Sequence, residues 1–415
     1  MERKVIQVEE RPPLLLNIPL SIQHLFAMFG STVLVPFLFG VNPTTCLFMN
    51  GIGTLLYIFL TKGKIPSYLG SSFAFISPVL LILSTSGYAD AQSGFIVFGL
   101  LFMLFSIIIH YVGTSWIDVI FPPAAMGAII AVIGLELAPV AANMAGLTGD
   151  NIQPVNIAVS MFTLAVGIIG SVAFRGFMSI IPILFGVICG YVFAAFMGMV
   201  NFQPIIDAPW LQLPHFYAPH FNLNAIMIIA PAALVVLAEH IGHLVVTGNI
   251  VERNLIKDPG LSRSLFADGL SNVVSGFAGA TPNTTYGENI GVMAITKVYS
   301  VWVIGGAAVM AILLSFIGKL SELIHSIPVP VMGGICILLF GVIAASGIRV
   351  LVEQKVDYSK SSNLIMTSVV MIIGLSGAKI SFGAFSVQGM VLATVVAIIM
   401  SLLFRVFEKL DLLNE

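Results

Sequence analysis

The chain has 415 residues, of which 58% are hydrophobic and only 9% are charged, and its mean hydropathy is +1.05. No soluble globular domain of this length has that balance, so the composition predicts a polytopic membrane protein. The formal net charge of -2 argues against a nucleic-acid partner. No low-complexity linker indicates an appended soluble domain, and we expect the first apolar segment to be retained because no signal-peptidase-type site follows it.

Twelve apolar segments are long enough, at about 20 residues, to cross a bilayer as helices. They begin near Leu14, Thr44, Ala91, Trp116, Pro154, Met178, Leu223, Ser264, Tyr299, Leu323, Ser362 and Ala384. Two more stretches, after Gly70 and at residues 281–297, are interrupted by polar residues. If both cross and the N-terminus is cytoplasmic, 15 of the 17 Lys and Arg lie inside, against 11 if neither crosses. The basic residues therefore favour fourteen spans with both termini cytoplasmic.

Residues 281–297 are too polar for an ordinary transmembrane helix. Pro282 and the β-favouring residues 284–286 predict a short extended piece, followed by a half-helix from about Glu288 to about Thr296. Irregular backbone at membrane depth persists only where protein or a water-filled cavity covers it. Such a break is typical of a binding site.

The sequence also repeats itself at about half its length. The matching features are residues 121–127 with 327–333, Gln23-His24 with Glu239-His240, and Phe73 with Tyr286, at offsets of 206, 216 and 213 residues. Seven spans per half is an odd number, so the second half is predicted to be upside down relative to the first. We therefore expect an all-α protein with a 7+7 inverted repeat, in which spans 3 and 10 are each an extended piece plus a half-helix.

Inserting an ionisable residue at the centre of a transmembrane helix costs roughly 2.5 to 3.5 kcal/mol, so each one in these spans is a candidate for a functional role. Glu239 and His243 are one helical turn apart and share a face. Such a pair can hold a proton and pass it on, although a simple hydrogen bond between the two is the alternative. Glu288 opens the half-helix, where free N–H groups and the helix dipole favour its anionic form.

The internal repeat predicts that unpaired backbone N–H groups at Phe73 face those at the start of the second half-helix. Glu239 and Glu288 then alternate as acceptors with main-chain donors, in a slot lined by Phe73 and Tyr286. A flat heterocycle whose edge alternates N–H and C=O would fit this slot. Uracil has such an edge, and so do the pyrimidine halves of xanthine and urate.

The segment Glu-Asn-Ile-Gly-Val-Met-Ala-Ile-Thr-Lys at 288–297 resembles the signature of the nucleobase-ascorbate transporter family. The resemblance covers nearly the whole chain and includes Gln23-His24 and residues 70–75, 238–243 and 281–297. It implies a core domain of residues 1–113 (spans 1–4) and 223–320 (spans 8–11), and a gate domain of residues 114–222 (spans 5–7) and 321–415 (spans 12–14). It also implies a homodimer, surrounded by lipid, in a bacterial cytoplasmic (inner) membrane.

For function, the resemblance implies import of uracil with a proton by alternating access, without a cofactor. Glu239 and Glu288 would accept from the ring nitrogens, and backbone N–H groups of Phe73 and of Gly287 or Glu288 would bind the carbonyls. Tyr286 would line the site, and His243 would help Glu239 and Glu288 to couple the proton. Further candidate site residues are Gln23, His24, Asp268, Asn289 and Phe340.

Two positions depart from the pattern, and each leaves an alternative open. Phe340 stands where we expect a tyrosine, and Asp268 where we expect an asparagine. An acid at 268 is typical of purine-transporting relatives, so a broader symporter of xanthine and other purines is the alternative, and a helix–helix hydrogen bond is the plain structural role for Asp268. Glu136 lies in the predicted gate half, which favours packing or gating over ligand contact.

Two other function classes fit less well. A channel is possible because broken spans also build selectivity filters, but paired carboxylates in a single slot favour a carrier. A metalloprotease would need two histidines and an acid at ligand spacing, but residues 239–243 fit neither H-E-x-x-H nor H-x-x-E-H, because position 236 is Val and position 238 is Ala. We therefore expect neither catalytic residues nor a bound metal.

Overall fold

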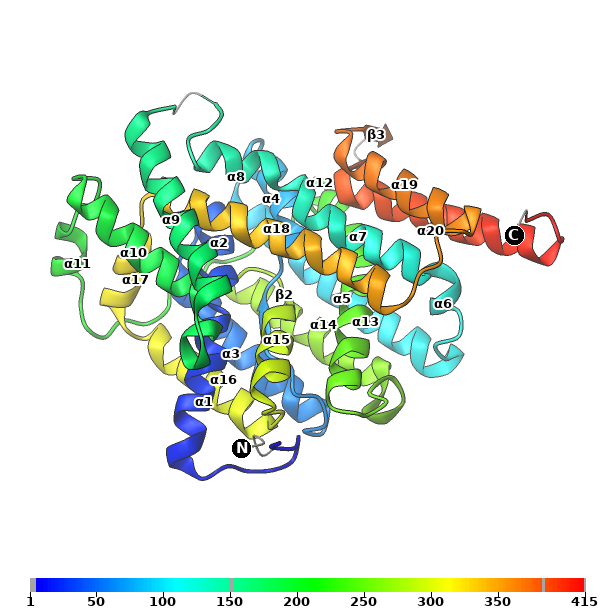
Figure 1. The fold of residues 1–415 in the computed structure, drawn as a ribbon, viewed down its shortest axis with the longest axis horizontal. Coiled ribbons are helices and arrows are strands. Elements are labelled where there is room, and N and C mark those ends of the chain that lie inside the picture. Colours follow the sequence, from blue (N-terminus) through cyan, green and yellow to red (C-terminus); the bar gives the residue numbers. More distant parts are fainter. Residues whose placement is uncertain (1–4, 150–151, 383–384, 414–415) are drawn as a thin grey trace.

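The computed structural model describes residues 5–149, 152–382 and 385–413, and most of these are helical (Figure 1). The predicted start of the last span near Ala384 lies outside these ranges. Eight helical segments in the described residues are long and apolar enough to cross a membrane. They are Leu14–Phe39, Pro43–Leu60, Tyr88–Val112, Pro123–Met144, Pro154–Ala173, Leu223–Ile250, Val329–Glu353 and Gly389–Lys409. The predicted membrane protein of helical spans is confirmed at this level.

The helices of the first half of the chain are α1 (Leu14–Ala27), α2 (Phe29–Phe39), α3 (Pro43–Leu60), α4 (Ile76–Leu83), α5 (Tyr88–Val112), α6 (Ile117–Ile120), α7 (Pro123–Glu136), α8 (Ala138–Met144), α9 (Pro154–Ala173), α10 (Pro182–Phe196) and α11 (Gln203–Asp207). Those of the second half are α12 (Leu223–Ile229), α13 (Ala232–Ile250), α14 (Leu261–Ala278), α15 (Gly287–Thr296), α16 (Val301–Ser315), α17 (Gly318–His325), α18 (Val329–Glu353), α19 (Ser361–Leu375) and α20 (Gly389–Lys409). Single turns of other helix types are η1 (Phe73–Phe75), η2 (Gly176–Ile180) and η3 (Ile256–Gly260).

Proline sets several helix starts. A proline occupies one of the first two positions of α3, α7, α9, α10 and α18, where its missing N–H costs nothing. The predicted span start near Leu323 was wrong for this reason. Pro328 stands at the N-cap of α18 in an extended conformation, so α17 ends at His325 and the long helix begins only at Val329.

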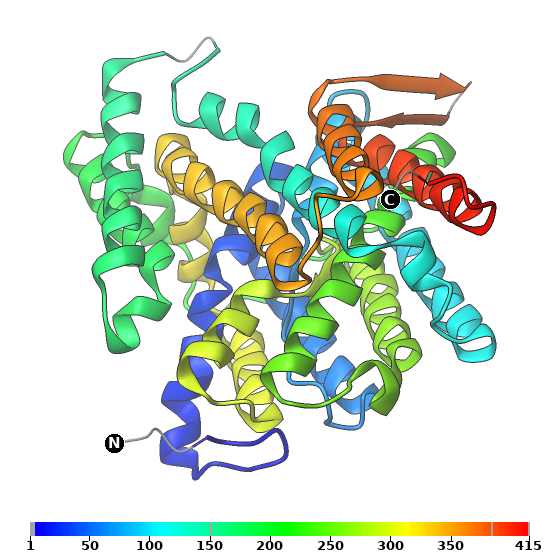
Figure 2. The same cartoon turned by 45° about the vertical axis from the view of Figure 1, so that its right-hand side comes forward.

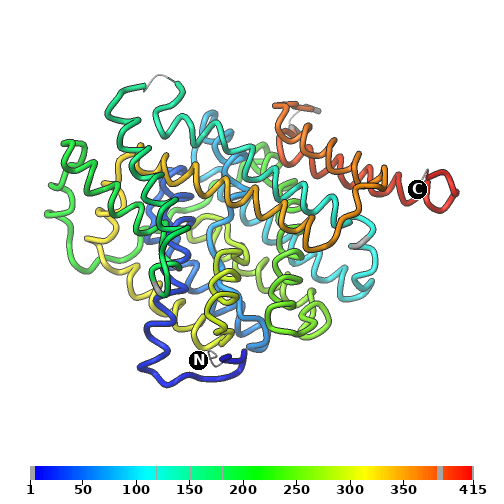
Figure 3. The backbone as a smooth tube through the Cα atoms, viewed as in Figure 1, coloured from blue at the N-terminus to red at the C-terminus, as the bar shows by residue number. Residues whose placement is uncertain are grey.

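The helices pack into two groups that are each drawn from both halves of the sequence. In one, α14 packs against α3 and α5, and α16 packs against α1 and α3. In the other, α18 packs against α7, α8 and α9, α19 packs against α7 and α20, and α10 packs against α9. The tube in Figure 3 shows the blue and yellow segments of the first group beside each other and the orange α18 among the teal segments of the second. The division into a core domain and a gate domain at the predicted residue bounds, and their separate movement, stay predictions.

Near the middle of the molecule, two short strands replace helix. Strand β1 (Leu69–Ser71) pairs with β2 (Asn283–Thr285) in antiparallel register, Gly70 lying opposite Thr284. η1 and α4 follow β1, and α15 follows β2 (Figure 1). The extended piece and half-helix predicted for residues 281–296 are therefore observed, and the two breaks satisfy each other's backbone, as buried irregular chain must.

A second two-stranded sheet was not predicted. Strands β3 (Lys379–Phe382) and β4 (Phe385–Gln388) form an antiparallel hairpin in which Ile380 lies opposite Val387. Figure 2 shows these strands projecting beyond the ends of α19 and α20. Sequence reasoning treated this stretch as the ends of two spans, and α20 begins only at Gly389.

The first described residues are tied to the chain that follows α15. Ile6 forms an isolated parallel bridge with Val298, and the Val301 N–H donates to the Val8 carbonyl over 2.9 Å. Glu9 forms an ion pair with Arg253, whose guanidinium holds the pKa of the Glu9 carboxyl below its ordinary value by hydrogen bonding to it. This end of the chain thus holds α15 and the α13–α14 connection together.

Helices α5 and α14 cross at a pair of glycines. A Cβ at Gly269 would lie 2.6 Å from the Gly99 carbonyl oxygen, and a Cβ at Gly99 would lie 2.5 Å from that of Gly269. We therefore expect Gly269→Ala to lower the free energy of unfolding by about 1–3 kcal/mol, because the backbones must separate. The measurement is the Tm in detergent. Gly341→Ala is the control, since a Cβ there meets no atom within 4 Å, and equal Tm values for the two variants would contradict the close crossing.

Candidate functional site

The two-stranded sheet aims the starts of two helical pieces at the centre of the molecule. Phe73 opens η1 directly after β1, and Gly287 and Glu288 lie in the first turn of α15 directly after β2. The Ser72 N–H donates to the Pro282 carbonyl over 2.8 Å, which extends the pairing of the strands. Because the first N–H groups of a helix have no partner within it, both starts offer backbone donors. An acceptor placed between them would satisfy both.

Three buried aromatic rings border this point. The centroid of Phe73 lies 6.1 Å from that of Tyr286 and 6.0 Å from that of Phe340 on α18. Phe340 belongs to the second group of helices, so the border combines side chains of both groups. Gly70 lets Tyr286 approach the strand, because a Cβ at this position would lie 3.0 Å from the Tyr286 ring. The predicted pair Phe73 and Tyr286 is brought together, and Phe340 joins it.

The two predicted acids come from neighbouring helices. Glu239 lies on α13 and Glu288 on α15, these helices pack against each other, and both side chains are half-buried. Within the described residues, Glu239 Oε2 is buried without a hydrogen-bond partner. Buried oxygens of this kind normally have a donor, because leaving one unpaired costs free energy. The carboxylate is therefore free to accept from a molecule that enters the site.

His243 faces the same turn of α15. Its Nδ1 lies 2.8 Å from the Thr285 carbonyl oxygen, so Nδ1 carries the proton and donates. Its Nε2 points toward the start of α15, 3.2 Å from where a Cβ at Gly287 would lie. The alternative in which His243 simply bonds Glu239 is not what the described residues show, because this ring bonds Thr285 instead. Nε2 is left with a lone pair that can take a proton.

Helix α1 contributes a second histidine beside α15. The Asn289 amide nitrogen lies 3.0 Å from His24 Nδ1 and 3.3 Å from the His24 carbonyl oxygen, so it donates to this residue. Among the described residues, Asn289 Oδ1 has no partner. Gln23 is half-buried next to His24. These three candidates therefore lie on the α1 side of the half-helix, where His24 fixes the Asn289 amide.

Asp268 lies in a separate, fully buried network behind β2. Its Oδ2 is 2.8 Å from His240 Nδ1 and accepts from the Thr284 hydroxyl over 3.2 Å, and its Oδ1 accepts from the Asn272 amide over 3.0 Å. On the other side of the His240 ring, Nε2 lies 2.7 Å from the Ser264 hydroxyl. Asp268 thus fastens α14 to α13 and to β2.

Sequence reasoning missed most of this network. The Asn272 amide donates to the Asn283 carbonyl over 2.7 Å, and the Asn283 N–H donates to the Asn272 side chain over 2.8 Å. A signal was present, because polar residues recur at helical spacing along one face of α14. They are Ser264, Asp268, Ser271, Asn272 and Ser275. This polar face receives β2, which explains why the helix carries so many polar side chains inside a membrane protein.

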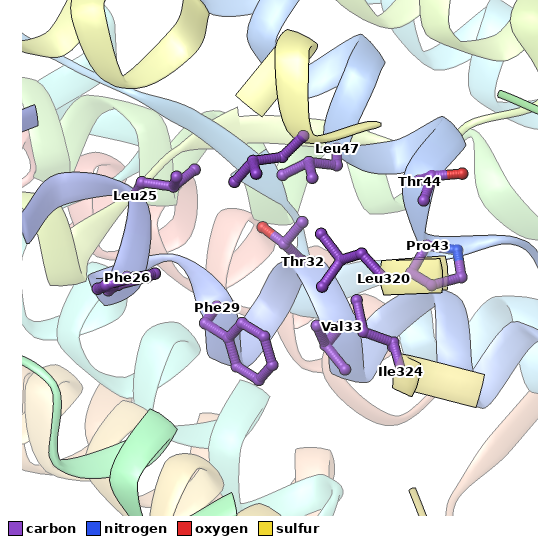
Figure 4. Close-up of a pocket in the computed structure, with 11 residues that line it drawn as sticks. Leu25, Phe26, Phe29, Thr32, Val33, Pro43, Thr44, Leu47, Leu320 and Ile324 are labelled. Carbon is purple, nitrogen blue, oxygen red and sulfur yellow. The ribbon is translucent and has the colours of Figure 1, made fainter. Parts of the chain in front are cut away.

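The described residues also line cavities outside this site. Figure 4 shows an apolar one of about 90 Å³ between α1, α2, α3 and the α16–α17 region, where Phe29, Val33 and Ile324 leave few polar groups to orient a heterocycle. A larger cavity of about 190 Å³ separates α13 from α7 and the end of α18. In the part of the chain that the structure describes, no group of three or more His, Cys, Asp or Glu could hold a metal ion.

One family model and several uracil permeases are similar to this chain over most of its length. Residues 16–383 match the model of the Permease family. A uracil permease of Paenibacillus larvae is 62% identical over 421 residues, covering 100% of both chains. A uracil permease of Escherichia coli K12 is 64% identical over 413 residues, covering 99% of this chain and 96% of the relative. One of Bacillus subtilis is 48% identical over 396 residues, covering 92% and 91%.

Solved structures share the fold at much lower identity. The transmembrane domain of the cyanobacterial bicarbonate transporter BicA superposes with a TM-score of 0.62 at 15% identity, covering 96% of this chain and 100% of that chain. The murine anion transporter Slc26a9 in its inward-facing state superposes with a TM-score of 0.70 at 12% identity, covering 96% and 69%. The fold is thus that of known membrane transporters.

Proposed function

Because this chain belongs to the Permease family, we propose that it carries uracil, together with a proton, across the bacterial cytoplasmic membrane by alternating access. It is a multi-pass membrane transporter rather than an enzyme. The observation that carries the choice of substrate is the unpartnered Glu239 carboxylate oxygen beside the first turn of α15, where acceptors and backbone donors alternate.

We propose that the chain crosses the membrane fourteen times in a 7+7 inverted repeat. Within the described residues, four shorter apolar segments join the eight long ones: Phe73–Leu83, Pro182–Phe196, Val301–Ser315 and Ser361–Leu375. The polar α14 and the unit of β2 with α15 bring the total to fourteen. The two broken units pair with each other at the centre, as symmetry-related parts of an inverted repeat do.

In the proposed binding mode, uracil lies between the two helix starts. Its ring N–H groups donate to Glu239 and Glu288, and its carbonyls accept from backbone N–H groups of Phe73 and of Gly287 or Glu288. The rings of Phe73 and Tyr286 border its faces. Every polar edge of the substrate then has a partner, which a buried polar ligand requires.

The proton is proposed to bind at Glu239, Glu288 and His243. The free Nε2 lone pair supports His243 as an acceptor, since its Nδ1 proton is held by Thr285. A proton on this group of residues offsets the cost of carrying the acids through the membrane. Proton binding and uracil binding would then favour the same occupied state, which is the condition for symport.

Uracil is preferred over purines for two reasons. Two relatives that cover nearly the whole chain are named uracil permease. Asp268, the residue that suggested a broader range, has both carboxylate oxygens engaged by other side chains and offers no free acceptor. The homodimer, the surrounding lipid and the cytoplasmic position of both termini are part of the proposal and rest on the family resemblance and the distribution of basic residues.

The test is uptake of labelled uracil into proteoliposomes with an imposed inward proton gradient. We expect saturable uptake that a protonophore abolishes and that excess xanthine leaves unchanged. Uptake that ignores the protonophore would overturn proton coupling. Strong competition by xanthine would replace uracil with a broader nucleobase range, and uptake linear in concentration would indicate a channel.

A further inference from the structure

Glu136, the last residue of α7, joins three helices through one carboxylate. Its Oε1 accepts a hydrogen bond from the Ser77 hydroxyl over 2.9 Å, and its Oε2 accepts one from the Met390 N–H over 2.9 Å. Ser77 lies in the first turn of α4 and Met390 in the first turn of α20. One side chain therefore links the half-helix of the first broken unit to two helices of the other group.

The chain around α20 is built to admit this carboxylate. Gly389 has φ +53, and a Cβ there would lie 1.9 Å from Glu136 Oε1. Any other residue at 389 would displace the acid. The free N–H groups and positive dipole end of α20 also favour an anion at this place. Glu136 thus belongs firmly to the α7–α20 group, whereas its bond to Ser77 is a single contact with the opposite group.

The Ser77–Glu136 bond and the larger cavity between the two groups lie at different places along α7. Helix α4, which carries Ser77, lies on the side of the molecule that carries α8 and α12, away from the N-terminus (Figure 1). The cavity of about 190 Å³ is lined by Met126 near the start of α7, by Gly242 on α13 and by Val350 near the end of α18.

The second half of the proposed inverted repeat has no counterpart of the Glu136–Ser77 bond at the corresponding position. The offset of 206 residues places Val342 at the position that corresponds to Glu136, and Val342 has no polar atom to make an equivalent bond. The chain therefore has a polar link for closing one end and none at the corresponding position for closing the other.

We propose that Glu136 is the outer-gate residue of this transporter, holding α4 against α7 and α20 in the inward-facing conformation through its bond to Ser77. The proposal rests on the alternating access and orientation given under the proposed function. The Ser77–Glu136 bond breaks each time the outer side opens, while the bond to Met390 persists. Weakening the link shifts the resting population toward the outward-open conformation.

The experiment measures how readily the outer side opens, without using a substrate. Ile228 on α12 lines the small space beside Ser77 and Glu136. Ile228→Cys in a chain whose Cys46, Cys189 and Cys336 are replaced by alanine is labelled with a membrane-impermeant maleimide, applied to either side of proteoliposomes. Ser77→Ala removes only the bond between the groups and leaves the Met390 bond, so it separates gating from local structure. Ser84→Ala is the matched control, because that exposed hydroxyl bonds only within its own helix.

We expect Ser77→Ala to raise the labelling rate from the outer side about tenfold, the shift that losing one hydrogen bond to a charged group produces. Glu136→Gln should also raise the labelling rate from the outer side. The Tm of this variant is measured in parallel to detect misfolding. Unchanged labelling in Ser77→Ala, or an equal rise in Ser84→Ala, would overturn the gate. Absence of uracil uptake by the parent protein would refute the proposed substrate and leave this result intact, so the two failures are distinguishable.

Discussion

Replacing Glu239 with glutamine is expected to weaken uracil binding and to abolish accumulation. Glu239 Oε2 has no partner among the described residues, so in the proposed site it accepts from a ring N–H of uracil. Glutamine keeps one acceptor oxygen, but its NH₂ group cannot accept a hydrogen bond and the substitution removes the charge. Losing one hydrogen bond to a charged group costs about 1.5–3 kcal/mol, roughly 10- to 100-fold in affinity. Isothermal titration of purified protein and uptake into proteoliposomes measure binding and transport separately.

Glu288→Gln should behave similarly, because Glu288 supplies the second acceptor from the first turn of α15. Glu408→Gln is the control, since this exposed acid on α20 pairs with Arg405 on its own helix. A double variant of Glu239 and Glu288 that still accumulated uracil against its gradient would eliminate the proposed mechanism. Retained binding with lost accumulation would instead assign both acids to proton coupling alone.

The existence of the two breaks could be predicted from sequence, but their pairing could not. Pro282 and the β-branched residues beside it are local signals that weaken a helix wherever they occur. That Gly70 lies opposite Thr284 depends on the packing of α14 behind β2, which no local pattern contains. Periodicity reports which face of a segment is buried, whereas register depends on partners that are distant in sequence.

The hairpin of β3 and β4 was missed for a related reason. Its residues are apolar enough to continue a span, and Gly377 has a positive φ of 69° that ends α19 early. The start of α18 was misplaced because the apolar run from Leu323 hides two separate helices. Pro328 indicated that a new helix begins after it, but the span start was placed from hydropathy alone.

The role of Asp268 shows what a family pattern cannot supply. An acid inside a span is a functional candidate by default. Its partners His240, Asn272 and Thr284 lie on three different elements, so only the folded chain reveals that its oxygens are occupied. By contrast, Glu239 Oε2 has no hydrogen-bond partner among the described residues, so Glu239 is the stronger candidate for binding a ligand.

His243→Asn is expected to separate uracil exchange from proton-driven uptake. The asparagine NH₂ group can take the place of Nδ1–H and donate to the Thr285 carbonyl, which lies 2.8 Å from Nδ1 in the native chain. The contact of α13 with β2 would then persist. What the variant lacks is Nε2, the nitrogen that faces the start of α15 with a free lone pair. We expect exchange of labelled for unlabelled uracil to stay within a few-fold of the native rate, while accumulation driven by a proton gradient falls at least tenfold.

His243→Ala removes both the Thr285 bond and the proton acceptor, so exchange and accumulation should fall together. His325→Asn is the control for replacing a histidine, because that exposed residue lies at the end of α17, away from the site. Full gradient-driven accumulation in His243→Asn would show that the proton travels on the acids alone. Loss of exchange in His243→Asn, with intact folding by Tm, would mean that Nε2 contacts uracil itself, and the proton would then have to be assigned to Glu239 or Glu288.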